Sequence, residues 1–93
     1  MDEEKIQKAL ERFIKNPYWK GIYEGAPERA KEYYRYIFAG SLEEGTDAAR
    51  SEALVKCYKE MGDADWDYII GHEEDRMGRW GLKQAREKYQ KKS

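Results

Sequence analysis

The sequence predicts an all-α protein, a compact bundle of four or five helices in a single domain that spans residues 1–93. In three separate segments, apolar residues recur at the three- and four-residue spacing of a helix, and each segment stops at a proline or a glycine. No segment alternates apolar and polar residues as a half-buried strand would, and no Asn-Gly or Asp-Gly hairpin turn occurs. A length of 93 residues also suits one small domain.

The first predicted helix spans about residues 3–15, and it ends before Pro17 because a residue that precedes proline is disfavoured in the α conformation. Its apolar stripe consists of Ile6, Ala9, Leu10, Phe13 and Ile14. Residues 17–26 hold three aromatic side chains and two glycines. We interpret this segment as a connector that folds over the core, with one short helical turn after Pro17 at most.

The second predicted helix begins at Pro27 and ends at Gly40. Its stripe consists of Ala30, Tyr33, Tyr34, Ile37 and Phe38. Ser41 and Glu44 fit a capping box, but Gly45 follows at once, so any helix there is short. The third helix is capped by Thr46 or Asp47 and ends at Gly62, with an apolar face of Ala53, Leu54, Cys57, Tyr58 and Met61.

The last thirty residues allow two interpretations. Trp66, Ile69, Ile70, Met77 and Trp80 keep the phase of one helical face. Because glycine disfavours a helix interior, we expect a helix over about residues 64–77, a bend near 78–81, and a basic helix over about 82–91. The alternative is one long bent helix over residues 64–91.

Composition excludes a membrane protein. Charged residues make up 40% of the chain, the mean hydropathy is −1.12, and no apolar run approaches the ~20 residues that span a bilayer. No apolar segment follows the acidic Met1–Glu4 start, so no secretory signal is expected. Cys57 is the single cysteine, which excludes an internal disulfide. These features predict a cytoplasmic location.

One acidic pattern has the spacing of a cation site. Asp63, Asp65, Asp67 and Glu74 fall at positions 1, 3, 5 and 12 of a twelve-residue segment, with Ile70 at position 8. This spacing resembles the calcium-binding loop of EF-hands, which implies a single calcium site at residues 63–74. Tyr68 occupies position 6, where that loop has glycine. The alternative is that Asp63 or Asp65 caps a helix and Asp67 favours its dipole.

Catalytic patterns do not emerge from the sequence. His72 opens a zinc-motif-like stretch, but Arg76 stands where the second histidine belongs, and the chain has no other histidine. Cys57 lies on the apolar stripe in mid-helix, which favours a buried structural cysteine over a nucleophile. Nucleotide-binding glycine motifs and serine-nucleophile motifs are absent from the sequence. We therefore expect no enzyme, no catalytic residues, no metal ligands and no cofactor.

The charge is unevenly distributed along the chain. Residues 41–75 carry eleven acidic and three basic side chains, whereas residues 76–93 carry seven basic and one acidic. The basic set could follow a nucleic-acid backbone, with Trp80 or Tyr89 stacking on a base; it consists of Arg76, Arg79, Lys83, Arg86, Lys88, Lys91 and Lys92. The neighbouring acidic segment and an overall pI of about 5.9 disfavour that function. The asymmetry equally fits packing of the basic tail beside the acidic segment.

Aromatic residues are dense between positions 18 and 38: Tyr18, Trp19, Tyr23, Tyr33, Tyr34, Tyr36 and Phe38. Surplus Tyr and Trp side chains at a surface favour a protein interface, although the same rings could simply pack the connector onto the bundle. By elimination, the sequence predicts a small non-enzymatic protein–protein interaction or regulatory module. Nucleic-acid binding by the basic C-terminal helix and calcium binding at residues 63–74 are the two alternatives.

Overall fold

The computed structural model describes residues 3–42 and 48–90, and within these ranges it holds six α-helices and no β-strand. The all-α prediction is confirmed, whereas the expected count of four or five helices is too low. The helices are α1 (Glu3–Phe13), α2 (Pro17–Gly25), α3 (Glu28–Leu42), α4 (Ala48–Glu60), α5 (Asp63–His72) and α6 (Arg76–Tyr89). The predicted cap at Thr46 or Asp47 and the predicted box of Ser41 with Glu44 rest on residues 43–47, which lie outside the described residues.

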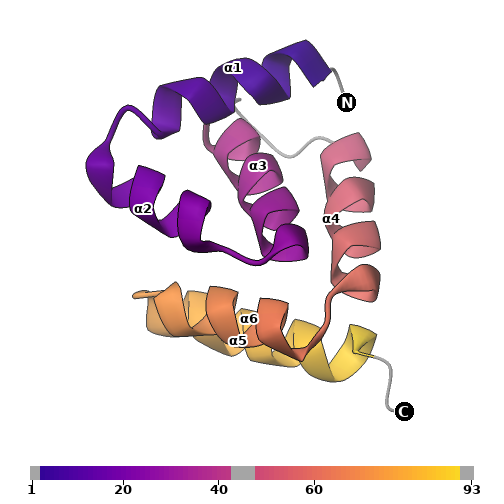
Figure 1. Ribbon diagram of the computed structural model, residues 1–93. Coiled ribbons are helices and arrows are strands. Elements are labelled where there is room, and N and C mark those ends of the chain that lie inside the picture. Colours follow the sequence, from indigo (N-terminus) through magenta and orange to yellow (C-terminus); the bar gives the residue numbers. More distant parts are fainter. Residues whose placement is uncertain (1–2, 43–47, 91–93) are drawn as a thin grey trace.

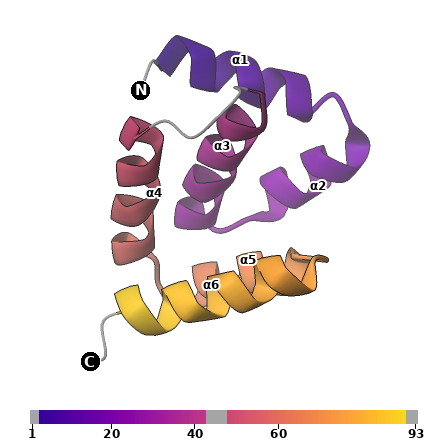
Figure 2. The same cartoon turned by 180° about the vertical axis from the view of Figure 1, so that it is seen from behind.

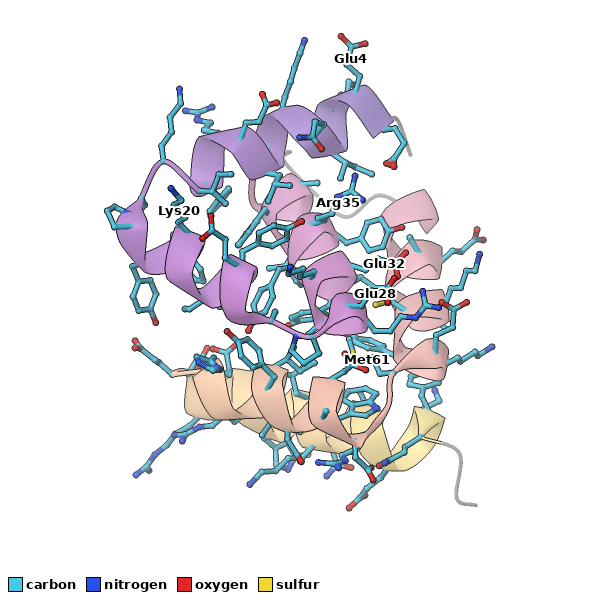
Figure 3. The ribbon with its side chains drawn as sticks, in the orientation of Figure 1. Glu4, Lys20, Glu28, Glu32, Arg35 and Met61 are labelled. Carbon is cyan, nitrogen blue, oxygen red and sulfur yellow. The ribbon has the colours of Figure 1, made fainter. Side chains whose placement is uncertain are left out.

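The helices form a layered arrangement around α3 (Figure 1). α3 and α4 stand side by side, α1 crosses one end of this pair, and α2 flanks α3. α5 and α6 run in opposite directions across the other end, and the view from behind brings α6 to the front (Figure 2). Arg35 of α3 lies beneath α1 in Figure 3 and pairs with Glu3 at 3.4 Å.

The main core draws side chains from all six described helices. Leu10, Ile22, Cys57 and Leu82 represent α1, α2, α4 and α6, and most of the rest comes from α3 and α5. Ala26 and Met61 add to it from the junctions between helices. Aromatic rings fill much of it: Phe13 stacks on Phe38 with centroids 4.5 Å apart, and the fully buried Trp66 stacks on Tyr58 at 5.4 Å. Such ring pairs stabilise a small core beyond their buried area.

Residues 17–25 form a full helix, so the interpretation of this segment as a connector was wrong. The Asn16 side chain accepts a hydrogen bond from the Tyr18 amide at 2.9 Å, and Pro17 occupies the first helical position. Asparagine at the cap and proline at the first position favour a helix start as strongly as they favour the end of the preceding helix. The new helix then buries Ile22 and packs Trp19 edge-on against Phe38.

Asp65 joins the starts of two helices. One of its carboxylate oxygens accepts the amide of Ala30, in the first turn of α3, at 3.1 Å. The other accepts the amide of Gly62, directly before α5, at 2.9 Å. Pro27, at the head of α3, has no side-chain oxygen to cap its own helix, so a residue from a distant helix caps it. Asp65 thus caps a helix, but the helix is α3. Gly62, and not Asp63 or Asp65, is the N-cap of α5, where Asp65 accepts the Gly62 amide from the third helical position.

The break between the last two helices falls at residues 73–75 and not at residues 78–81 as predicted. Two helices are present, and Gly78 and Gly81 both lie inside α6. Asp75 caps α6 through the Met77 amide at 2.9 Å, and the Glu73 carboxylate accepts the Asp75 amide at 3.1 Å. A side-chain cap thus sets the break, because it satisfies amides that a continuous helix would have bonded internally.

The lengths and side chains of the described helices are also informative about membranes. None of these helices is both long enough and apolar enough to pass through a bilayer.

Candidate interaction surface

The outer side of α6 presents large apolar side chains to solvent. Met77 is 72% exposed and Trp80 is 61% exposed. Leu82, on the opposite side of the helix, is buried in the core, with Ala85 and Tyr89 packed against the same cluster. The sequence interpretation placed Met77 and Trp80 in phase with the buried Trp66 and Ile69. Because the chain leaves the helix at residues 73–75, α6 does not continue the apolar side of α5, and Met77 and Trp80 point outward.

Basic side chains surround these two residues. On a helix, Arg76 and Lys83 lie one turn before and after Trp80 on the same side. Arg76, Arg79 and Lys83 are exposed, and within residues 3–42 and 48–90 no acidic group pairs with them. Nitrogen-tipped side chains line this outer edge of the molecule in Figure 3. We call the surface made by Arg76, Met77, Arg79, Trp80 and Lys83 the α6 face.

Arg86 differs from these cations, because it binds back onto the molecule. It contacts Asp67 at 2.7 Å and Asp63 at 3.2 Å on α5. The hydrogen bond that Arg86 donates to the Asp67 carboxylate is the main cause of a raised pKa for the Arg86 guanidinium. The uneven charge of the sequence is therefore partly internal pairing, through Arg86, and partly unpaired charge, on the α6 face. Lys91 and Lys92 lie outside the described residues.

The calcium-loop interpretation of residues 63–74 was wrong about their conformation. Residues 63–72 form a helix and not a loop, so Asp65 is buried while Asp63 and Asp67 are exposed. Asp63 and Asp67 pair with Arg86, Asp65 accepts amides at the starts of two helices, and Glu74 accepts the Tyr18 hydroxyl at 3.1 Å. In the described part of the chain, no group of three or more His, Cys, Asp or Glu residues is placed to hold a metal ion.

Cys57 and His72 each have a structural partner. The Cys57 thiol is buried and donates to the Arg29 carbonyl at 3.5 Å, as a structural cysteine would. Burial, followed by the nearby Glu32 carboxylate, raises the pKa of this thiol to about 12, which disfavours a reactive thiolate. The His72 ring stacks on Tyr68, and its Nδ1 lies 2.9 Å from the Tyr68 carbonyl oxygen.

The aromatic group proposed as an interface is mostly core. Tyr33, Tyr34 and Phe38 are buried, and Tyr36 packs against the small cluster of Ile6, Ala9 and Ala39. Within this group the exposed ring is Tyr18, at 49%. Tyr89, considered for base stacking, lies against Tyr58 with centroids 5.8 Å apart.

The sequence did not predict the exposure of Met77, and it left the exposure of Trp80 open, since this ring was also considered for base stacking. One sequence feature indicated a new helix: Asp75 directly precedes the basic segment that begins at Arg76. Asp is a common N-cap, and a helix that starts at a new N-cap need not keep the apolar phase of the helix before it.

Comparisons of the chain with protein-family models, with curated proteins and with solved structures found no significant match. The function is therefore argued from the residues of this chain.

Proposed function

We propose that this protein is a small, non-enzymatic binding module of the cytoplasm that holds an acidic segment of a partner protein on the α6 face. One observation carries the proposal. Met77 and Trp80 are exposed at 72% and 61%, within a ring of basic side chains that lack an acidic partner in the described residues.

The composition of the α6 face fits the centre of a protein interface. Trp, Met and Arg are enriched in interfaces, and Trp and Arg are the residues whose truncation most often weakens binding. A large apolar side chain gains roughly 1.5–3 kcal/mol when it is fully buried, so Trp80 in a partner's pocket would supply much of the affinity. Leu82 anchors α6 from its other side, which keeps the face rigid before binding.

Charge decides the kind of partner. Arg76, Arg79 and Lys83 surround the apolar pair, so a segment that places Asp or Glu residues around its own apolar side chains is complementary. Nucleic acid is the weaker candidate, because Asp75 caps α6, the exposed Glu87 lies within α6 one turn after Lys83, and Tyr89 is packed inward. The lone, buried Cys57 thiol is in keeping with a reducing cytoplasm.

A titration with defined probes tests the proposal. The full chain, labelled with ¹⁵N, is titrated with a synthetic peptide of glutamate and leucine in helical spacing, and separately with a short DNA duplex. We expect the peptide to shift the Trp80 indole and the α6 amides and to bind more weakly as salt rises. The same peptide with glutamine in place of glutamate should bind several-fold more weakly.

Charge reversal provides the matched control. Arg76→Glu with Lys83→Glu should abolish peptide binding, whereas Lys15→Glu with Lys20→Glu makes the same change in net charge and should preserve it. Lys15 and Lys20 are exposed, and Lys20 lies on α2, away from α6 (Figure 3). Binding that survives the reversal on α6 would overturn the proposal. Tighter binding of the duplex than of the peptide would transfer the function to nucleic acid.

A further inference from the structure

A second feature lies on a different part of the molecule from the α6 face. A pocket of about 150 Å³ opens between α2, α3 and the turn that joins α5 to α6. Four aromatic residues, Tyr18, Trp19, Tyr33 and Tyr34, and two carboxylates, Glu73 and Glu74, are among its lining. We call it the aromatic pocket.

The rings of the aromatic pocket lie in several planes. Tyr18 and Trp19 meet with centroids 5.1 Å apart and an angle of 75° between their planes. Tyr33 and Tyr34 meet at 5.2 Å and 69°. A group inside the pocket therefore meets aromatic rings of different orientation. The negative face of an aromatic ring attracts a cation, and the attraction grows as water is excluded.

The carboxylates of the aromatic pocket add two negative charges. One oxygen of Glu73 accepts the Asp75 amide at 3.1 Å, and one oxygen of Glu74 accepts the Tyr18 hydroxyl at 3.1 Å. Among the described residues, neither carboxylate forms an ion pair with a Lys or Arg side chain. Within residues 3–42 and 48–90, their negative charge is thus left without a Lys or Arg partner, although the neighbouring surface of α6 is basic.

The buried tyrosines of the pocket remain neutral, so the negative charge around the pocket comes from its carboxylates. Burial, together with nearby Glu73, raises the pKa of Tyr33 and of Tyr34 well above the ordinary value. Uncharged rings and two carboxylates together form an environment that favours a cation and disfavours an anion.

We infer that the aromatic pocket binds an alkylated ammonium group, in which methyl groups contact the rings while the positive charge faces Glu73 and Glu74. Its volume is below the roughly 300–1,000 Å³ of pockets that hold drug-sized ligands, so a head group fits and a whole metabolite does not. A bare ammonium carries three donors that need acceptors, whereas an alkylated one loses donors and gains apolar surface. The inference is independent of the partner proposed for α6.

A comparison of charged and neutral probes tests this inference. Choline is titrated into the full chain alongside 3,3-dimethylbutanol, which has the same shape without the charge. We expect choline to shift the side-chain resonances of Trp19, Tyr33 and Tyr34, and the neutral analogue to bind at least about tenfold more weakly. Equal binding of the two would show an apolar pocket without cation selectivity and would overturn the inference. The absence of any shift with choline would also overturn it.

Variants then assign the charge to its source. Glu73→Gln keeps an oxygen for the Asp75 amide but removes the charge, and it should weaken choline binding about fivefold to tenfold. Glu24→Gln removes the same charge from an exposed position on α2 outside the pocket and should leave binding unchanged. Equal effects of the two variants would refute a specific role for the pocket carboxylate.

Two further measurements are needed. The first distinguishes the possible sources of the ligand, and the second distinguishes this inference from the function proposed for the α6 face. A short peptide that contains trimethyllysine is compared with choline, and tighter binding of either one identifies a modified protein or a free small cation as the source. The variant with Arg76→Glu and Lys83→Glu should bind choline at least as well as the unaltered chain. The inference therefore survives or fails separately from the function proposed for the α6 face.

Discussion

At the scale of single residues, the carboxylate of Asp65 joins two parts of the chain that are far apart in sequence. It accepts the Ala30 amide of α3 and the Gly62 amide before α5, and it is itself almost entirely buried. Buried amides left without an acceptor are costly, because water cannot replace the lost bond. The position of Asp65 therefore couples the start of α3 to the α5–α6 layer.

Removal of this carboxylate should destabilise the fold strongly. We expect Asp65→Ala to lower the free energy of unfolding by about 2–4 kcal/mol, the scale of a lost helix cap plus a buried unpaired amide. Asp67→Ala is the matched control, because it removes an exposed carboxylate from the same helix. The loss of its contact with Arg86 should cost less than about 1 kcal/mol. Urea unfolding followed by circular dichroism measures both, and equal losses would contradict the role assigned to Asp65.

At the scale of the helices, α6 shows how two glycines in one helix differ. A Cβ at Gly78 would lie 2.8 Å from Cδ of Glu73, whose side chain covers this position. A Cβ at Gly81 would meet nothing within 4 Å. Gly78 thus permits the close approach of the α5–α6 turn, whereas Gly81 only weakens the helix.

The two glycines should respond differently to alanine. Gly81→Ala should raise the free energy of unfolding by about 0.5–1 kcal/mol, because alanine favours the helix interior and restricts the unfolded chain. Gly78→Ala should give a smaller gain or a loss, since Glu73 must move and the Asp75 amide then loses its acceptor. Thermal unfolding of the two variants measures the difference. A larger gain at position 78 than at position 81 would show that Glu73 does not constrain the turn.

The same elements show what the sequence could predict. The stripes of α1, α3 and α4 were visible because each helix presents one continuous apolar side to the core. The Asn16-Pro17 pair was ambiguous, because it both ends one helix and starts the next. The cap of α3 by Asp65 could not be predicted from local sequence, because Asp65 and Ala30 are 35 residues apart. For the site, the basic residues of α6 were predicted, but the outward direction of Trp80 followed only from the cap at Asp75.

At the scale of the whole molecule, burial of weakly acidic groups makes stability depend on alkaline pH. The core encloses the Cys57 thiol and the hydroxyls of Tyr33, Tyr34 and Tyr58, and burial raises the pKa of each. In the unfolded chain these groups titrate near their ordinary values. Above those values the folded state therefore binds more protons than the unfolded state, and stability falls as pH rises.

Cys57 sets the first part of this decline, because its unfolded pKa is the lowest of the four and its folded pKa is about 12. Its contribution is fully present below about pH 9 and should be lost at up to about 1.4 kcal/mol per pH unit between pH 9 and 12. Urea unfolding at closely spaced pH values from 8 to 10 measures the initial slope, before most lysines and tyrosines titrate. Cys57→Ala should lower stability at neutral pH but flatten the dependence on pH in this window. An unchanged slope in that variant would show that the thiol is not the group responsible, and would place the first proton loss on another buried group.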